Sequence, residues 1–210
     1  MTVDLGKKLL VATHNKGKLA EFRQMLEPAG ITVIGAADAN LPEPEETATT
    51  FEGNAALKAE AAMNALKIPA LSDDSGLTVD ALGGDPGIYS ARWAGPDKDF
   101  GHAMARVLTA LDEAGCKAPA ERRGAFIAVL ALARPGAETV FFEGRTDGVV
   151  APAPRGTGGF GYDPLFIPDD GDGRTFGEMT ADEKHGHPLP LSHRARAISK
   201  FATALNLSAR

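Results

Sequence analysis

A short segment near the N-terminus combines groups that bind anions: Thr13, His14, Asn15, Lys16, Gly17 and Lys18. An apolar stretch precedes it and a helical pattern follows it, so its backbone amides open a helix N-terminus, a ready anion site. It is not a Walker A loop, because Ala12 and Leu19 occupy the places of the required glycine and hydroxyl residue. The segment indicates phosphate binding, with a solvated turn carrying incidental lysines as the alternative.

Two adjacent carboxylates, Asp73 and Asp74, follow a short apolar run where a metal or a general base is commonly mounted. A haloacid-dehalogenase-type phosphatase needs its second aspartate two residues on, where this chain has Ser75. In extended backbone adjacent side chains point to opposite faces, so one of the two carboxylates would face a given site. Glu45 and Glu46 could supply further oxygen ligands for Mg²⁺. An Asx turn and an exposed acidic linker are the alternatives for these pairs.

The glycine-rich segment 156–164 matches the letters of the G-x-G-x-x-G dinucleotide fingerprint. That motif requires a helix to start at its third glycine, whereas Pro164 and an apolar run follow here. We therefore expect a glycine loop that presents Phe160 and Asp163, suited to stacking an aromatic ring on a flat ligand. A glycine-rich surface turn is the alternative.

Other polar clusters carry less chemistry. The spacing of His185, His187 and His193 fits no ordinary zinc site. We expect the acidic segment 169–172 to be a surface turn, because it lacks the terminal glutamate of a calcium loop. The single cysteine, Cys116, fits a reducing compartment and needs no catalytic role.

Composition indicates a globular protein. The chain has 210 residues, 43% hydrophobic and 24% charged, and we expect a single domain over 1–210, built as two lobes. No apolar run is long enough to span a bilayer, so we expect a cytoplasmic location and no membrane partner. The formal net charge of -6 argues against a nucleic acid polymer as partner but not against a nucleotide.

Apolar periodicity predicts an α/β protein with a mixed sheet flanked by helices, because both crossovers and hairpins occur. We expect Thr49 and Glu52 to form a capping box, and Ser75-Gly76 to be a turn between two short strands. The expected strands are 8–12, 32–35, 70–73, 77–81, 125–133 and 140–145. The expected helices are 18–27, 49–66, 97–114 and two shorter ones that begin after Thr180 and Ser192.

Taken together, these segments resemble the inosine/xanthosine triphosphate pyrophosphatase family over nearly the whole chain. The matching segments are 13–18, 45–47, 50–51, 54–58, 72–77, 86–92, 156–164, Lys184 and 192–194. The resemblance implies a long mixed sheet in two lobes with a central cleft, Mg²⁺ dependence and a homodimer. One departure is the longer spacer between Lys184 and His193.

The resemblance also implies roles for individual residues. Glu45 and Asp74 would hold the metal, and Asp74 would be the proton acceptor. The first loop, from Thr13 to Lys18, would hold the phosphates together with Lys58. The residues expected around the rest of the substrate, with Phe160 stacking on the base, are Ser75, Phe160, Gly161, Tyr162, Asp163, Lys184, His193 and Arg194.

The implied reaction is hydrolysis of deaminated purine nucleoside triphosphates (ITP, dITP and XTP) to a monophosphate and pyrophosphate, which keeps these nucleotides out of DNA and RNA. Two alternatives stay open. One is a nucleotide pyrophosphatase with another base preference, and the other is a nucleotide sensor without turnover.

Overall fold

A computed structural model describes residues 5–186 and 190–206 of the chain. Within them a six-stranded sheet has the order β2-β1-β3-β4-β5-β6. β1 pairs in parallel with β2 and β3, whereas β5 and β6 are antiparallel, so the sheet is mixed as predicted. The strands are β1 (Lys8–Val11), β2 (Thr32–Gly35), β3 (Ala70–Val79), β4 (Arg123–Ala133), β5 (Val140–Val150) and β6 (Phe166–Pro168).

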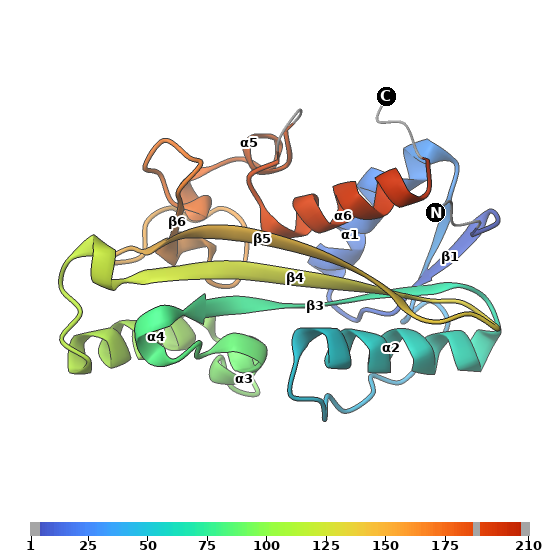
Figure 1. Cartoon of the computed structure of the whole chain (residues 1–210), viewed down its shortest axis with the longest axis horizontal. Helices are drawn as coiled ribbons and strands as arrows, with labels where there is room; N and C mark the ends of the chain where they lie inside the picture. The colour runs from blue at the N-terminus through green and yellow to red at the C-terminus, as the bar shows by residue number, and fades with distance from the viewer. Residues whose placement is uncertain (1–4, 187–189, 207–210) are drawn as a thin grey trace. The chain divides into compact units, whose positions relative to one another are not determined.

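Helices flank this sheet, which confirms the α/β class (Figure 1). The last two helices begin where the sequence predicts, because the side chains of Thr180 and Ser192 accept hydrogen bonds from the amides of Glu183 and Ala195. The α-helices are α1 (Lys16–Leu26), α2 (Phe51–Leu66), α3 (Ser90–Trp93), α4 (Phe100–Glu113), α5 (Ala181–His185) and α6 (His193–Ala204). Among the described residues no helix is long and apolar enough to cross a membrane.

Two local expectations are wrong. The N-cap of α2 is Thr50 rather than Thr49, because Thr50 is extended and its Oγ1 accepts from the amide of Gly53 at 3.0 Å. Ser75 and Gly76 form no turn, because β3 runs unbroken from Ala70 to Val79. A Cβ at Gly76 would overlap the carbonyl oxygen of Gly87, so glycine lets a neighbouring segment approach the strand closely.

The chain divides into two compact units, and β3, β4 and β5 contribute residues to both. The described part of the first unit comprises residues 5–74, 129–143 and 197–206. The described part of the second comprises 75–128, 144–186 and 190–196. Each candidate group below belongs to one of these units.

Each unit has an apolar core of its own. In the first, Leu10 of β1 packs with Ala62 of α2 and Ala70 of β3. In the second, Val107 of α4 packs with a cluster that includes Phe126, and buried residues recur at helical spacing along α4. Burying a side chain as large as Val or Phe contributes roughly 1.5–3 kcal/mol, so these cores hold the strands that carry the site.

Candidate active site

The anion-binding segment of the first unit is the loop between β1 and α1. Asn15 is the N-cap of α1, and its Oδ1 accepts from the amides of Gly17 and Lys18 at 2.9 and 3.2 Å. Thr13 Oγ1 accepts from the amide of Asn15 at 3.2 Å. Both side-chain oxygens therefore shape the loop, while the exposed start of the helix keeps the character of an anion site.

His14 has a positioning contact in the same loop. Its Nε2 donates to the carbonyl oxygen of Leu41 at 2.9 Å. Because Leu41 lies four residues before Glu45, this bond joins the loop to the acidic segment that follows β2. The bond to Leu41 positions the His14 ring, and the contact of His14 with substrate stays a prediction.

The two aspartates of β3 contact lysines from different helices. Asp73 Oδ2 lies 2.8 Å from Lys18 Nζ of α1, whereas Asp74 Oδ1 lies 3.6 Å from Lys58 Nζ of α2. In the first unit α1 and α2 lie on opposite faces of the strands (Figure 1). The predicted alternation of Asp73 and Asp74 is therefore confirmed, and Asp74 is the one that shares a face with Lys58.

Lys58 also contacts the acidic linker, since its Nζ lies 2.6 Å from Glu46 Oε1. Glu46 is half-buried, whereas Glu45, the predicted metal ligand, is exposed. The linker therefore contributes Glu46 to a cluster with Lys58 and Asp74, and the metal-binding role of Glu45 stays a prediction. No group of three or more His, Cys, Asp or Glu residues is placed to hold a metal ion within the described part of the chain.

Burial and charge shift the pKa values of this cluster. Burial raises the pKa of the Asp74 carboxyl above its ordinary value, and the attraction of Lys58 opposes that shift in part. Burial alone would lower the pKa of Lys58, but Asp74, Asp73 and Glu46 together outweigh it and raise that pKa. The result is a charged lysine beside a carboxylate that takes up a proton more readily than an exposed aspartate does.

The aromatic ring of the second unit is exposed, as the sequence predicts. Phe160 keeps 40% of its surface accessible, and the guanidinium carbon of Arg194 lies 5.2 Å from its ring centroid. Arg194 Nη2 also donates to Ser75 Oγ at 3.0 Å. Phe160, Arg194 and Ser75 therefore form one connected group, in which the exposed ring can stack on a planar ligand.

A buried ion pair between Asp163 and Lys184 supports the glycine-rich segment 156–164. Asp163 Oδ2 accepts from Lys184 Nζ at 3.0 Å and from the amide of Phe160 at 3.2 Å. Burial raises the pKa of Asp163 despite the opposing charge of Lys184. Gly159 has φ +73°, and a Cβ there would overlap the Asp163 carboxylate. The glycine loop is therefore built around this pair, and no α-helix starts at Gly161, which confirms that segment 156–164 is not a dinucleotide fingerprint.

Two of the predicted substrate-binding residues, Tyr162 and His193, are buried. Tyr162 is 3% exposed, and its hydroxyl donates to the carbonyl oxygen of Ser90 at 2.9 Å. The His193 ring stacks on Phe126 with centroids 4.6 Å apart and planes at 10°. The buried Tyr162 side chain therefore fixes the backbone of the loop. The contacts of Tyr162 and His193 with substrate stay predictions.

A model of the Ham1 family matches residues 9–204. The chain belongs to the Ham1 family. It is 55% identical over 198 residues to a dITP/XTP pyrophosphatase of Rhodopseudomonas palustris, covering 93% of this chain and 94% of that protein. A dITP/XTP pyrophosphatase of Bradyrhizobium diazoefficiens is 54% identical with 93% of each chain covered. These findings confirm the resemblance predicted from the sequence.

Solved structures of Ham1 proteins show the same fold. The Ham1 protein of Coxiella burnetii superposes with a TM-score of 0.85 at 35% identity, covering 96% of this chain and 99% of that one. The Ham1 protein of Staphylococcus aureus gives a TM-score of 0.83 at 36% identity, covering 95% and 98%.

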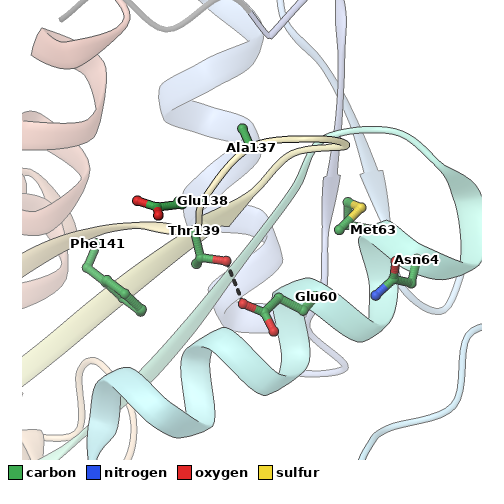
Figure 2. A pocket seen from close by; sticks show the side chains of 7 residues that line it. All are labelled: Glu60, Met63, Asn64, Ala137, Glu138, Thr139 and Phe141. Carbon is green, nitrogen blue, oxygen red and sulfur yellow. Dashed lines mark hydrogen bonds between the residues drawn. The ribbon is translucent and has the colours of Figure 1, made fainter.

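One pocket of this Ham1-family chain lies apart from the predicted site residues. It has a volume of about 430 Å³, and Figure 2 shows the side chains around it, with Thr139 Oγ1 donating to Glu60 Oε1 at 2.6 Å. None of the predicted ligands lines it. Its residues are Glu60, Met63, Asn64, Ala137, Glu138, Thr139 and Phe141.

Two residues of the site make contacts that the sequence does not predict. Asp73 acts as the partner of Lys18, a pairing that spacing cannot reveal across more than fifty residues. Ser90 bonds to both β3 and the Tyr162 hydroxyl. Its position inside the matched segment 86–92 was the available signal, but the residue pattern there predicts no role for the segment.

Proposed function

We propose that this protein hydrolyses deaminated purine nucleoside triphosphates, dITP, ITP and XTP, to the nucleoside monophosphate and pyrophosphate. The observation that carries the proposal is the pairing of Asp74 with Lys58 on β3 and α2, in a chain more than half identical to dITP/XTP pyrophosphatases. A buried carboxylate beside a lysine supplies a base and a phosphate-binding cation.

The first unit supplies the phosphate-binding groups. In this proposal the phosphates bind to the N-terminus of α1, with Lys16 and Lys18, and to Lys58 of α2. Asp73 holds the ammonium of Lys18, and Glu46 holds that of Lys58, so both lysines are pre-oriented before substrate arrives.

Asp74 is the proton acceptor in this proposal. A water molecule gives its proton to the Asp74 carboxylate while its oxygen forms a bond to the α-phosphorus. The bond from the α-phosphorus to the oxygen bridging to the β-phosphorus breaks, and pyrophosphate departs with that oxygen. Lys58, which shares a face of β3 with Asp74, stabilises the negative charge that develops on the leaving group.

The carboxylates of this cluster also suit Mg²⁺, which prefers oxygen ligands and is held by few protein carboxylates. Asp74 and Glu46, which both contact Lys58, would hold it, with Glu45 as the ligand predicted from the sequence. When bound, Mg²⁺ would neutralise phosphate charge and polarise the phosphoryl oxygens.

The second unit supplies the groups for the base. Phe160 stacks on the ring plane, and Arg194 and Lys184 carry donors but no acceptors. Donors favour the O6 acceptor of a 6-keto purine over the amino group of adenine. A site that leaves buried polar groups unpaired with ATP would reject it by ~10⁴ or more. GTP shares the 6-keto edge, so its rejection requires a penalty against the 2-amino group.

The test is hydrolysis of ITP, dITP, XTP, GTP, ATP and TTP with and without Mg²⁺, resolving pyrophosphate from orthophosphate. We expect Mg²⁺-dependent release of pyrophosphate, mainly from ITP, dITP and XTP. Orthophosphate release would move the cleavage to a terminal phosphate and refute the mechanism. Preference for a pyrimidine would favour the alternative base specificity, and binding without turnover would favour the sensor.

The variant Asp74→Asn tests the role of the base. We expect at least a 100-fold loss of kcat, because general bases contribute about 10²–10⁴-fold. We expect a melting temperature no lower than that of the wild type, because burial raises the pKa of Asp74 and its ionised form therefore costs folding free energy. Unchanged turnover would refute the assignment of Asp74.

Homodimerisation and a cytoplasmic location are part of the proposal, inferred from the family resemblance and from the sequence. Sedimentation at micromolar concentration should give twice the chain mass of 21.9 kDa. A monomer that hydrolyses ITP at full rate would refute the dimer but not the activity.

A further inference from the structure

Tyr162 stands between two residues of the proposed base site, yet its own side chain points into the core of the second unit. Its ring meets Phe100 edge-on, with centroids 5.6 Å apart and planes at 81°. Its hydroxyl donates to the Ser90 carbonyl at 2.9 Å. Burial raises the pKa of the Tyr162 phenol well above its ordinary value, so the hydroxyl remains a donor at all ordinary pH values.

Ser90 is in turn bound to β3 by its side chain. Its Oγ accepts from the amide of Leu77 at 3.0 Å and donates to the carbonyl oxygen of Gly87 at 2.7 Å. The residue is 5% exposed and opens α3. Ser90 therefore connects three segments: β3, the turn at Gly87 and, through its carbonyl oxygen, the loop 156–164.

β1 pairs with β3 at Ala70 and Leu71, near the start of the strand. The same edge of β3 is therefore open to segment 85–90 farther along. Farther along β3, the segment 85–90 supplies partners: the amide of Val79 donates to the Asp85 carbonyl at 3.1 Å, and Thr78 forms a bridge with Pro86. The absence of a side chain at Gly76 lets the Gly87 carbonyl approach. Segment 85–90 thus takes the place of a neighbouring strand along residues 76–79 of β3.

We infer that Ser90 and Tyr162 are positioning residues. They hold the Phe160 loop, residues 156–164, in a fixed position relative to β3 and thereby set base selectivity. Two connections run from neighbouring residues of β3 to this loop. Ser75 bonds to Arg194, which lies over the Phe160 ring, and Leu77 bonds to Ser90, which bonds to Tyr162. The inference rests on the proposed function, since it assigns the loop to the base.

The first test is Tyr162→Phe, which removes one hydroxyl and keeps the ring. The net free energy of a typical hydrogen bond corresponds to a change of about three- to tenfold in an equilibrium constant. We therefore expect KM for ITP to rise by that factor and kcat to stay within about twofold. The ratio of kcat/KM for ITP to that for ATP should fall, because a loosened loop discriminates bases less well. KM for ATP should change less than KM for ITP.

Tyr89→Phe is the matched control. Tyr89 is the chain's other tyrosine, lies in the same segment as Ser90 and is 43% exposed. The same loss of a hydroxyl there should leave KM, kcat and the ITP-to-ATP ratio as in the wild type. An equal effect of Tyr89→Phe and Tyr162→Phe would overturn the inference.

The second test is Ser90→Ala together with the double variant carrying Tyr162→Phe. Because both side chains serve one connection, their effects on KM for ITP should be strongly non-additive, with the double variant close to the more impaired single one. Additive effects would overturn the connection. A lower melting temperature with an unchanged ITP-to-ATP ratio would show a merely structural role and would also overturn it.

The two proposals fail separately. If the wild type releases no pyrophosphate from ITP, the proposed function fails whatever Tyr162 does. If the wild type prefers ITP and Tyr162→Phe keeps both its KM and its ITP-to-ATP ratio, the positioning role fails and the activity stands.

Discussion

At the scale of single residues, the chemistry depends on how burial and charge compete at Asp74. The carboxyl is buried enough for its pKa to rise, yet Lys58 lies 3.6 Å away and keeps the ionised form accessible. A base in this state accepts a proton from water more readily than an exposed aspartate does. Lys58 itself stays charged because three carboxylates surround it.

This competition predicts the pH dependence of kcat/KM. A base must be deprotonated to act, so activity falls as pH falls through the raised pKa of Asp74, at higher pH than for an exposed aspartate. Lys58→Gln removes the charge that opposes the rise, so the acid limb should move further up in pH while the maximum rate falls. Lys67→Gln, at the exposed end of α2, is the control. An acid limb that does not move in Lys58→Gln would contradict the assignment.

At the scale of elements, the N-terminus of α1 combines two functions in Asn15. Its Oδ1 accepts from the amides of Gly17 and Lys18, and this cap fixes the exposed start of α1, where we propose that phosphate binds. The cap is therefore part of the anion site, and its two functions can be separated by changing the acceptor and its charge independently.

Asn15→Ala should lower the free energy of unfolding by about 1 kcal/mol, through loss of the cap, and raise KM for ITP. Asn15→Asp keeps an acceptor and should retain stability, but its negative charge should raise KM further. Thermal or urea unfolding and steady-state kinetics check both variants. A KM in Asn15→Asp equal to that of the wild type would contradict phosphate binding at this loop.

At the scale of the whole molecule, stability comes from cores built by segments far apart in sequence. In the first unit Phe201 of α6 is fully buried and meets Phe142 of β5 with ring centroids 5.3 Å apart. The C-terminal helix thus packs on β5 in the core of this unit. Loss of such a contact removes a large share of the 5–15 kcal/mol that typically holds a domain folded.

Phe201→Ala should lower the free energy of unfolding by about 3–5 kcal/mol, because it leaves a cavity in this core. Phe141→Ala is the matched control, since Phe141 is 43% exposed and its loss should cost little. Denaturant unfolding measures both. Equal destabilisation by the two variants would show that Phe201 does not support the core as described.

Much of the fold and the candidate site could be predicted from local pattern. Apolar runs located β1, β2 and β4, and the capping residues Thr180 and Ser192 marked the last two helices. The proline after the glycine loop excluded a dinucleotide fingerprint. These features follow from backbone hydrogen bonding and side-chain periodicity over a few residues, so a short stretch of sequence is enough to specify them.

Other features depend on contacts between distant segments, so only the tertiary structure reveals them. Ser75-Gly76 looked like a turn, yet the packing of segment 85–90 beside them keeps β3 extended. Because side chains alternate along β3, Asp73 contacts Lys18 and Asp74 contacts Lys58. The Tyr162 hydroxyl bonds to the Ser90 carbonyl in the core of the second unit. Local patterns specify which residues could do chemistry, but burial and long-range pairing decide which of them can reach a ligand.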